Sequence, residues 1–357
     1  MDIEAVKLFD NNLELYSSIL KDIQIAKKSV FLEVFRFNPD SMGENFRNAL
    51  TLAASRGIEV KVLVDSWGTE NNSHFFEPIS KAGGTVRFYK KIRWFNASFF
   101  AKNHCRNHRK LLIIDHHISY LGSSNISAYS LSWRELNLRL DNAELSRLFI
   151  KAFFDSYNTY KIYELRKNSF KRDMHYKDMV IMQEIPAIHR QRLKQKYELL
   201  IHGAKKSVVI ETPYFLPGYR LRKTMVNAVK RGVKVLVIIP RHSDVLAVDI
   251  IRRHYLGLLA EKGIDIQLYE LGNLHAKGLL IDDETFSVGS ANFDYRSFRY
   301  QYEISLIGKD ETILSLLQDH LRQSIRYCRP FDYTKWKKRS TIEKIIENLL
   351  LPFRYLM

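Results

Sequence analysis

Apolar and polar residues alternate along this chain with two periods, one typical of helices and the other of strands. Residues 5–28 are predicted to form an amphipathic helix, because apolar side chains recur there at helical spacing. A strand is predicted over residues 30–37, a helix over residues 42–56 and another strand over residues 58–64. Gly57 is typical of the end of a helix. This order of elements predicts an α/β unit.

The second half of the chain repeats the pattern of the first. Residues 26–30 read AKKSV, and the same letters recur at residues 204–208. One more strand is predicted in each half, over residues 86–89 and 264–269. The remaining elements of the second half are predicted in the same order: a strand over residues 208–210, a helix ending at Gly232 and a strand over residues 233–239. The chain is therefore predicted to form two duplicated α/β sandwich domains.

A polar motif with the pattern HxKxxxxD is the strongest sign of duplication, because it occurs twice in the same register. The two copies contain His108, Lys110 and Asp115, and His275, Lys277 and Asp282. A serine, an asparagine and a glutamate follow each copy at nearly equal distances: Ser123, Asn125 and Glu135, and Ser290, Asn292 and Glu303. One such motif would be weak evidence of function. The two copies together are strong evidence of duplication, because chance would have to place every one of these polar residues twice.

The spacing of the motif places its polar residues on defined faces if the motif opens a strand. Side chains two positions apart point to the same face, so the His and the Lys of each copy lie side by side. The apolar runs at residues 111–114 and 279–281 suit strands buried on both faces at the centre of a sheet. Asp115 and Asp282 have the opposite parity, and an orienting or structural role is predicted for them.

At these residues the chain resembles the phospholipase D superfamily, and within it the bacterial cardiolipin synthases. The resemblance extends over most of the chain and rests on five segments: residues 107–110 (NHRK), 133–135 (WRE), 212–215 (TPYF), 274–277 (LHAK) and 289–297 (GSANFDYRS). It implies two phospholipase D-like sandwich domains with the active site at their pseudo-twofold interface. The chain departs from the family pattern at Gly122-Ser123, where Gly-Gly is usual, and at Glu135, where Asp is common.

The resemblance implies a two-step transfer at phosphorus through a covalent phosphohistidine, with no metal and no other cofactor. One histidine would attack the phosphodiester, and the other would protonate the departing alkoxide and then deprotonate the acceptor. By resemblance, His108 is the nucleophile and His275 the acid and base. The expected site comprises His108, Lys110, Asp115, His275, Lys277 and Asp282 as catalytic residues, Ser123, Asn125, Ser290 and Asn292 around the phosphate, and Glu135 and Glu303 as orienting carboxylates.

The expected reaction is that of a cardiolipin synthase, a phosphatidyltransferase that passes a phosphatidyl group to phosphatidylglycerol. Two alternatives stay open at this point. A phospholipase D or a nuclease-type phosphodiesterase would use water as the acceptor. A lipid-binding or membrane-tethering protein would use no catalysis, but the two intact copies of the motif argue against it.

Composition and charge narrow the class of partner. Hydrophobic residues make up 46% of the chain, which favours a folded protein over a disordered one. Lys and Arg number 56 against 39 Asp and Glu. The net charge of +17 would attract an anionic membrane or a nucleic acid, unless it only serves solubility. With the resemblance, we expect phospholipid substrates and a peripheral position on an anionic membrane, and nucleic acid is the less favoured partner.

Cysteine usage and hydropathy bear on where the protein acts. Cys105 and Cys328 are the only cysteines, and no Cys and His residues have the spacing of a zinc site. The first residues lack the apolar core of a signal peptide, and no apolar run approaches the ~18 residues of a membrane span. We therefore expect a short form without N-terminal transmembrane helices, cytoplasmic and peripheral on the inner face of the cell membrane.

The domain boundaries follow from the duplication. Residues 1–165 and 181–330 are predicted as the two domains, and residues 166–180 as a basic linker. An insertion within residues 90–107 interleaves cations with the aromatic residues Trp94, Phe95, Phe99 and Phe100. It suits a membrane interface or a phosphate-bearing ligand, and equally a loop whose aromatic residues cap the core.

Residues 331–357 are predicted as a separate basic and amphipathic segment. Ser340 and Glu343 have the spacing of a capping box at the start of a helix. The apolar residues that follow fall on one helical stripe: Ile342, Ile345, Ile346, Leu349, Leu350 and Phe353. That stripe is expected to pack on the body of the protein, which is the more usual arrangement, or else to lie at a membrane interface.

Overall fold

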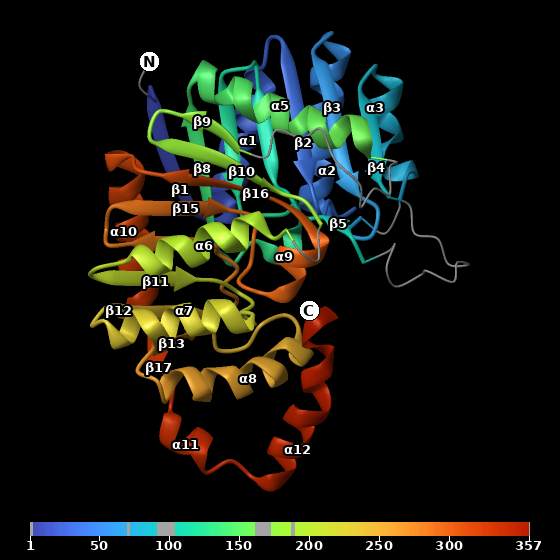
Figure 1. Ribbon diagram of the computed structural model, residues 1–357. Coiled ribbons are helices and arrows are strands. Elements are labelled where there is room, and N and C mark those ends of the chain that lie inside the picture. The colour runs from blue at the N-terminus through green and yellow to red at the C-terminus, as the bar shows by residue number, and fades with distance from the viewer. Residues whose placement is uncertain (1–2, 70–71, 91–103, 161–172, 187–189, 357) are drawn as a thin grey trace.

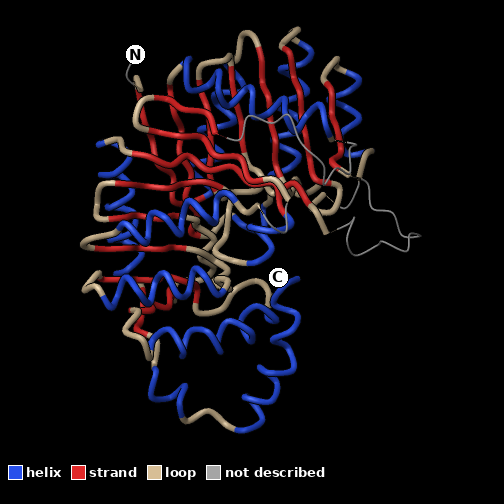
Figure 2. The backbone as a smooth tube through the Cα atoms, viewed as in Figure 1, coloured by secondary structure: helices blue, strands red, loops and turns tan. Residues whose placement is uncertain are grey.

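Two β-sheets share one apolar core and carry further helices on their outer faces (Figure 1). The structure is a computed structural model, and it describes residues 3–69, 72–90, 104–160, 173–186 and 190–356. In the view of Figure 2, strands of the first sheet run from top to bottom and strands of the second run from side to side. The predicted pair of α/β sandwiches is confirmed.

The first sheet and its helices come from the first half of the chain. The strand order is β1 (Ala5–Asn11), β8 (Arg134–Asp141), β7 (Ile118–Gly122), β6 (Leu111–Ile114), β2 (Ser29–Val34), β3 (Glu59–Asp65) and β4 (Thr85–Tyr89). The helices are α1 (Asn12–Ile25), α2 (Ser41–Ser55), α3 (Glu77–Lys81) and α5 (Ala143–Thr159), with short 3-10 turns η1 (His74–Phe76) and η2 (Ala128–Ser130). Strands β2, β3 and β4 are parallel, as strand–helix–strand units require.

The second sheet repeats this arrangement. Its order is β17 (Cys328–Pro330), β13 (Asp265–Tyr269), β12 (Lys234–Pro240), β11 (Ser207–Glu211), β14 (Gly278–Ile281), β15 (Thr285–Gly289), β16 (Gln301–Gly308), β10 (Met179–Glu184) and β9 (Asp173–Tyr176), and β5 (Arg106–Asn107) pairs with β16. The helices are α6 (Arg192–Gly203), α7 (Tyr219–Lys230), α8 (Leu246–Ala260), α9 (Tyr295–Tyr300) and α10 (Glu311–Arg326). Strands β11, β12 and β13 are parallel, like their counterparts in the first half.

The two motif strands, β6 and β14, are buried on both faces, as predicted. Leu111 and Ile113 of β6 belong to the core shared by the two sheets. Leu112 and Ile114 point to the other face, where they pack with residues of α1 and α2. Strand β14 alternates in the same way, because Leu280 belongs to the shared core and its neighbours pack in the outer core that α6 and α7 cover. The motifs are thus held at the centre of each sheet.

The helix predicted over residues 5–28 is wrong in its first part. Residues 5–11 form strand β1, which pairs antiparallel with β8 at the edge of the first sheet. The helix α1 begins only at Asn12, where the side chain of Asn11 accepts a hydrogen bond from the amide of Glu14. Edge pairing explains the difference, because a short strand with polar residues on one face is stabilised by its neighbour rather than by its own pattern.

Two further expectations concern the segments between and within the halves. Residues 173–180, expected as part of the linker, lie in the hairpin β9–β10 and its turn, at the edge of the second sheet. Residues 166–172 lie outside the described residues. So does most of the aromatic insertion, residues 91–103.

The C-terminal segment forms α11 (Tyr333–Lys337), α12 (Thr341–Leu350) and η3 (Leu351–Leu356). The predicted capping box is present, with Ser340 and Glu343 bonding each other's backbone. The expectation that the apolar stripe packs on the body is wrong for most of it: Leu350 packs there, but Ile342, Ile345, Ile346, Leu349 and Phe353 are exposed. Within the described residues, no helix is long and apolar enough to cross a membrane.

Candidate active site

The backbone of the opposite half holds each motif histidine. Strand β5 pairs in parallel with β16, and the amide of His108 donates to the carbonyl of Tyr302 at 3.0 Å. In the equivalent place Arg134 forms a bridge with Leu274, and the amide of His275 donates to the carbonyl of Arg134 at 2.7 Å. The chain therefore touches the other half just before each motif strand. Both histidines are brought to the interface of the two sheets.

The orienting glutamates pair with the histidines across this interface. Nδ1 of His108 lies 3.0 and 3.2 Å from the two carboxylate oxygens of Glu303. Nδ1 of His275 lies 3.0 Å from both oxygens of Glu135. A carboxylate in this place accepts the Nδ1 proton and leaves Nε2 as the reacting nitrogen. Since each histidine is oriented by a residue of the other half, neither half forms the site alone.

The two serines of the repeat serve the glutamates rather than a phosphate, which corrects their expected role. The hydroxyl of Ser123 donates to Glu135 at 2.5 Å and accepts from the amide of Leu136 at 2.8 Å. Ser290 does the same with Glu303 and the amide of Ile304, at 2.5 and 3.0 Å. Both serines are fully buried. Their hydroxyls are engaged in these bonds, which hold the two carboxylates in place.

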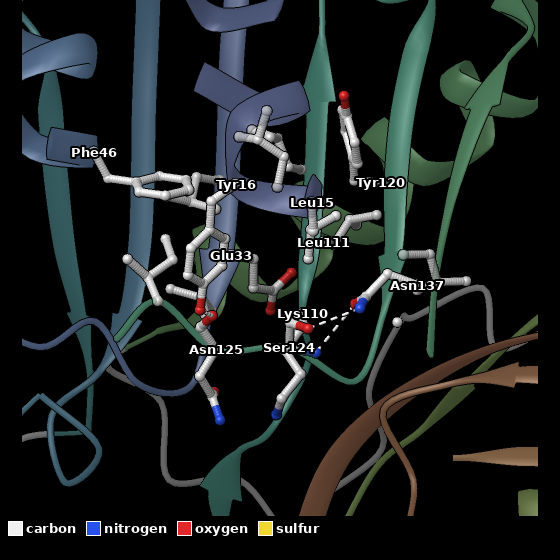
Figure 3. A pocket seen from close by; sticks show the side chains of 17 residues that line it. Leu15, Tyr16, Glu33, Phe46, Lys110, Leu111, Tyr120, Ser124, Asn125 and Asn137 are labelled. Carbon is white, nitrogen blue, oxygen red and sulfur yellow. Dashed lines mark hydrogen bonds between the residues drawn. The ribbon is translucent and has the colours of Figure 1, made fainter. Parts of the chain in front are cut away.

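Lysine and asparagine side chains supply the hydrogen-bond donors of the site. Nζ of Lys110 donates to the carbonyl of His108 at 2.8 Å. Nζ of Lys277 donates to the carbonyl of His275 at 2.7 Å and lies 3.1 Å from its Nε2. Figure 3 shows the amino group of Lys110 and the amide nitrogen of Asn125 pointing to the same side, away from the apolar residues above them. An ammonium group and an amide side by side suit the oxygens of a phosphodiester.

On the second half, Asn292 takes the position that Asn125 has on the first. Oδ1 of Asn125 accepts from the amide of Arg36 at 3.2 Å, which fixes the plane of its side chain. Oδ1 of Asn292 has no partner among the described residues, although it is buried. The backbone amide of Asn292 donates to the hydroxyl of Ser297 at 3.1 Å. Local bonds therefore hold both asparagines, and their contact with phosphate stays a prediction.

The two motif aspartates lie away from the histidines and tie strands together. Asp115 accepts hydrogen bonds of 2.7 to 3.1 Å from the amides of the first AKKSV segment, at Lys27, Lys28 and Ser29. Asp282 accepts bonds of 2.6 to 2.8 Å from the equivalent amides of the second segment. This geometry suits the structural role predicted from parity rather than the catalytic role that the family resemblance implies, and it explains why the AKKSV segment is repeated along with the motif.

Burial makes the site favour neutral imidazoles. Burial and the nearby ammonium groups of Lys110 and Lys277 hold the pKa of His108 well below its usual value. Burial also lowers the pKa of His275, but the charge of Glu135 opposes that shift. Both histidines are thus expected to be neutral near pH 7, and His275 is the one whose protonated form is better stabilised.

The remaining ionisable groups of the site are also shifted. Burial lowers the pKa of Lys110 to about 7, with a further effect of Lys277, and burial lowers that of Lys277 to about 8. Burial raises the pKa of Glu303 to about 8 against the attraction of Lys110. For Glu135 burial acts in the same direction, but His275 and Lys277 outweigh it and hold the pKa below its usual value. Lys110, Lys277 and Glu303 therefore titrate between about pH 7 and 8, and perturbed pKa values of this kind are common in active sites.

The structure adds residues that the sequence did not point to. An aromatic ring lies against each imidazole: the ring of Phe35 is 5.2 Å from His108, and that of Trp133 is 5.3 Å from His275. The charge of Arg296 also lowers the pKa of His108, although its effect is smaller than those of burial and of the two lysines. Trp133 and Arg296 lie inside segments that carry the family resemblance, and Phe35 follows the strand of the AKKSV repeat. Their position in or near these segments was the only feature of the sequence that could have indicated a role in the site.

A small cavity lies behind Lys110 in the first half. Its volume is about 40 Å³, and Figure 3 shows apolar side chains such as Leu15 and Phe46 around it, with Glu33 and Lys110 at one end. A water molecule needs ~10–15 Å³ measured in this way, so the cavity has room for a few waters and not for an acyl chain.

Side chains able to hold a metal ion lie elsewhere. Among the residues that the structure describes, Glu4, His117 and Asp141 are the one group of ligand-type side chains close enough to share an ion. They lie near the end of β8 opposite to Glu135. The histidines and glutamates of the site instead bond each other.

Two α/β sandwiches with paired His, Lys and Glu residues at their interface define the phospholipase D-like class of proteins. The crystal structure of phosphatidylserine synthase from Haemophilus influenzae has the same fold, with a TM-score of 0.80. The likeness covers 100% of this chain and 96% of that one at 15% sequence identity. A polyphosphate kinase from Porphyromonas gingivalis also shares the fold, with a TM-score of 0.66 over 99% of this chain and 53% of that one, at 12% identity.

The family within this class follows from the sequence comparisons. Residues 19–157 and 197–325 match the family described as "Cardiolipin synthase, PLD-like domain". A cardiolipin synthase of Listeria welshimeri is 32% identical, over 97% of this chain and 75% of its own length. The major cardiolipin synthase ClsA of Bacillus subtilis is 30% identical, over 99% of this chain and 77% of its own. The chain belongs to this family, and it is a phosphatidyltransferase of the phospholipase D superfamily.

Proposed function

We propose that the protein makes cardiolipin by transferring a phosphatidyl group to phosphatidylglycerol through a phosphohistidine. The observation that carries this proposal is the crossed pairing of His108 with Glu303 and of His275 with Glu135. It provides two oriented imidazoles at one buried place, which is what a two-step displacement at phosphorus needs. The relatives named cardiolipin synthase support the choice of lipid.

In the first step Nε2 of His108 attacks the phosphorus of a phosphatidylglycerol donor. The bond from phosphorus to the glycerol oxygen of the headgroup breaks, and a bond from phosphorus to Nε2 forms. His275 in its protonated form gives its Nε2 proton to the departing glycerol oxygen, so that glycerol leaves neutral. Glu135 stabilises the protonated form of His275, because its charge opposes the effect of burial on the pKa of that histidine.

In the second step the phosphatidyl group passes from Nε2 of His108 to a second lipid. His275, now neutral, takes the proton of a headgroup hydroxyl of phosphatidylglycerol, and the oxygen attacks phosphorus. The bond from phosphorus to Nε2 of His108 breaks, which restores the neutral imidazole and releases cardiolipin. Proton and phosphatidyl group balance over the cycle, because His275 begins and ends in its protonated form and His108 begins and ends as a neutral imidazole.

Two observations support His108 as the nucleophile. Its pKa is held well below the usual value by burial and by the surrounding cations, so the attacking lone pair is available at neutral pH. No hydrogen bond to its Nε2 is found within the described residues, whereas Nε2 of His275 lies 3.1 Å from Nζ of Lys277. This assignment agrees with the one that the family resemblance implies.

Lys110 and Lys277, with Asn125 and Asn292, are proposed to bind the phosphoryl oxygens. Charge builds on these oxygens in the transition state, and buried donors stabilise it more strongly than water would. The lysines enter from the two halves in equivalent places, as their bonds to the histidine carbonyls indicate. The positive charge that a metal ion would supply is thus available from side chains.

We further propose that the protein works on the inner face of the cell membrane, as a peripheral protein on anionic lipid. The substrates of a cardiolipin synthase are membrane lipids, and the net charge of +17 favours an anionic surface. Nucleic acid would be attracted by the same charge and is therefore included as a competing substrate in the test.

The test is to incubate the purified protein with phosphatidylglycerol vesicles and, separately, with single- and double-stranded nucleic acid. Cardiolipin and glycerol in equal amounts are the expected products. Phosphatidic acid in place of cardiolipin would mean that water is the acceptor. Cleavage of nucleic acid, with no lipid product, would mean that the protein is a nuclease. The matched control is the His275→Ala protein, in which product formation should be lost without loss of the fold.

A further inference from the structure

Helix α12 is attached to the protein with its polar side inward. Its apolar residues are exposed: Ile342 is 69% accessible, Ile345 52%, Ile346 43% and Leu349 68%. In the turn η3 that follows, the exposed apolar side chains are Phe353, Tyr355 and Leu356. These seven residues form what we call the outer apolar face. An amphipathic helix on a globular protein normally turns this stripe to the core, so the arrangement needs an explanation.

Ionic contacts hold the inner side of α12. Glu347 is only 2% accessible, and its carboxylate accepts from Nε of Arg339 at 3.2 Å. Glu343, one turn earlier, accepts from Arg253 of α8 at 2.9 Å. The guanidinium of Arg339 also lies 3.9 Å from the ring of Trp336 in α11. These polar contacts, together with the packing of Leu350, hold α12 with the outer apolar face turned outward.

The outer apolar face extends from α12 to α9. Leu350 and Leu351 pack against a small core that Tyr214 and Tyr295 also contact. The ring of Tyr355 in η3 lies 5.0 Å from that of Tyr295, which begins α9 three residues after Asn292. Figure 1 shows α11 and α12 at the end of the molecule far from the first sheet, and the C-terminus turning back toward α9. One end of the face thus lies against α9, the helix that begins three residues after Asn292.

Positive charge borders the same face. Lys335, Lys337 and Lys338 are exposed in and just after α11, and Lys344 is exposed on α12. Cations beside an apolar helical stripe are the features of helices that lie in the headgroup region of an anionic bilayer. A neutral or purely apolar partner would have no use for these lysines.

We propose that α12 and η3 dock on an anionic phospholipid bilayer, with the outer apolar face inserted among the lipid headgroups. The lysines then contact lipid phosphates, and the insertion of η3 sets the mouth of the active site against the lipid surface. A phospholipid could pass from the bilayer to the histidines without leaving an apolar surface. This inference rests on the proposed function, because it supposes that the substrate is a membrane lipid.

The test uses vesicle co-sedimentation of the full chain carrying Ile342→Glu and Leu349→Glu together. The matched control is Leu199→Glu, because Leu199 on α6 is 68% accessible and lies outside the face. The vesicles are an equal mixture of phosphatidylglycerol and phosphatidylcholine, or phosphatidylcholine alone. We expect the double variant to bind the mixed vesicles at least tenfold more weakly than the unaltered protein, and the control variant to bind them equally well.

A second variant and a second substrate keep the result independent of folding. Charge reversal at Lys337 and Lys338 should also weaken binding to mixed vesicles, more so at low salt, where screening is weak. Turnover of a short-chain phosphatidylglycerol below its critical micelle concentration should be unchanged in both variants. Such a monomeric substrate needs no docking, so unchanged turnover shows that the active site is intact.

Several results would overturn the docking surface. Binding of the double variant equal to that of the unaltered protein is one, and equal binding of the unaltered protein to neutral and mixed vesicles is another. A dimer in solution that Leu349→Glu converts to a monomer would assign the face to a second copy of the chain. If the unaltered protein makes no cardiolipin but the double substitution still abolishes vesicle binding, the proposed function fails while the docking surface stands.

Discussion

Glu135 and His275 lie 3.0 Å apart although they belong to opposite halves of the chain. The duplicated fold produces this contact twice, because Glu303 meets His108 in the same way. A duplication that keeps every polar residue in register would also be compatible with two separate sites, one in each half. The crossed contacts are what make it a single site.

The crossed pairing predicts which histidine responds to which glutamate. Replacing Glu135 by Gln removes a charge that raises the pKa of His275 against burial, so the pKa of His275 should fall further. Turnover should fall by about 10²- to 10⁴-fold, as for other carboxylates that orient a catalytic His. Histidine NMR titration would check the pKa, with Glu303→Gln as the matched variant. A fall at His108 rather than His275 in Glu135→Gln would contradict the pairing.

The sequence predicted the fold and the identity of most site residues because both are repeated. Strands β6 and β14 could be placed from their unbroken apolar runs, and the two aspartates could be set apart from the histidines by parity alone. The crossing could not be predicted, because the pattern of one half carries no information about the surface of the other. The serines were assigned to phosphate for a related reason. A hydroxyl bonds a phosphate or a carboxylate equally well, and only the fold brings Ser123 to Glu135.

The C-terminal helix shows a further limit of periodicity. The stripe of α12 was located correctly, and so was its capping box at Ser340. Periodicity indicates that a helix has two unlike sides, but not which side meets the protein. The polar side is held inward by the bond of Glu343 to Arg253 of α8 and by that of Glu347 to Arg339, and neither pairing could be read from spacing.

The structural role of the motif aspartates can be tested through stability. The carboxylate of Asp282 is partly exposed, and although burial would raise its pKa, bonds from the amides of Ser207, Lys205 and Lys206 hold it below its usual value. A lowered pKa means stability that is present above the unfolded-state pKa and lost as the pH falls through the folded-state value. Asp282→Asn should therefore lower the free energy of unfolding by about 1 kcal/mol at pH 7, and by less at pH 3.

Urea unfolding at the two pH values would measure this difference. The matched control is Asp283→Asn, since Asp283 is the exposed neighbour and should give no change at either pH. Equal losses at pH 7 and pH 3 would argue that charge has no part in the effect.

Activity is predicted to survive removal of divalent metal ions. Lys110 and Lys277 supply the positive charge next to the phosphate, and the described histidines and glutamates of the site are bonded to one another. Turnover of phosphatidylglycerol in excess chelator should equal turnover without it. If activity were lost in chelator and returned with a single divalent metal, the phosphohistidine mechanism would have to be abandoned.

The pH dependence of kcat/KM should be a narrow bell. Glu303, with a pKa of about 8, must be ionised to accept the Nδ1 proton of His108, so activity rises as the pH approaches 8. Lys110 and Lys277, with pKa values of about 7 and about 8, must stay charged to bind phosphate, so activity falls as the pH rises through these two values. The maximum is therefore expected between about pH 7 and 8. In Glu303→Gln the acidic limb should disappear, and its persistence would assign that limb to another group.

Trapping the covalent intermediate would separate the roles of the two histidines. With a donor phospholipid labelled in its phosphate, the unaltered protein should carry a transient label that acid releases, as expected for a phosphoramidate. His108→Ala should carry none, because the attacking nitrogen is gone. His275→Ala should accumulate some label, because the donor step is slowed but the acceptor step lacks its base as well. Label on His108→Ala and none on His275→Ala would exchange the two roles. Substantial turnover by both variants would place the chemistry outside this pair.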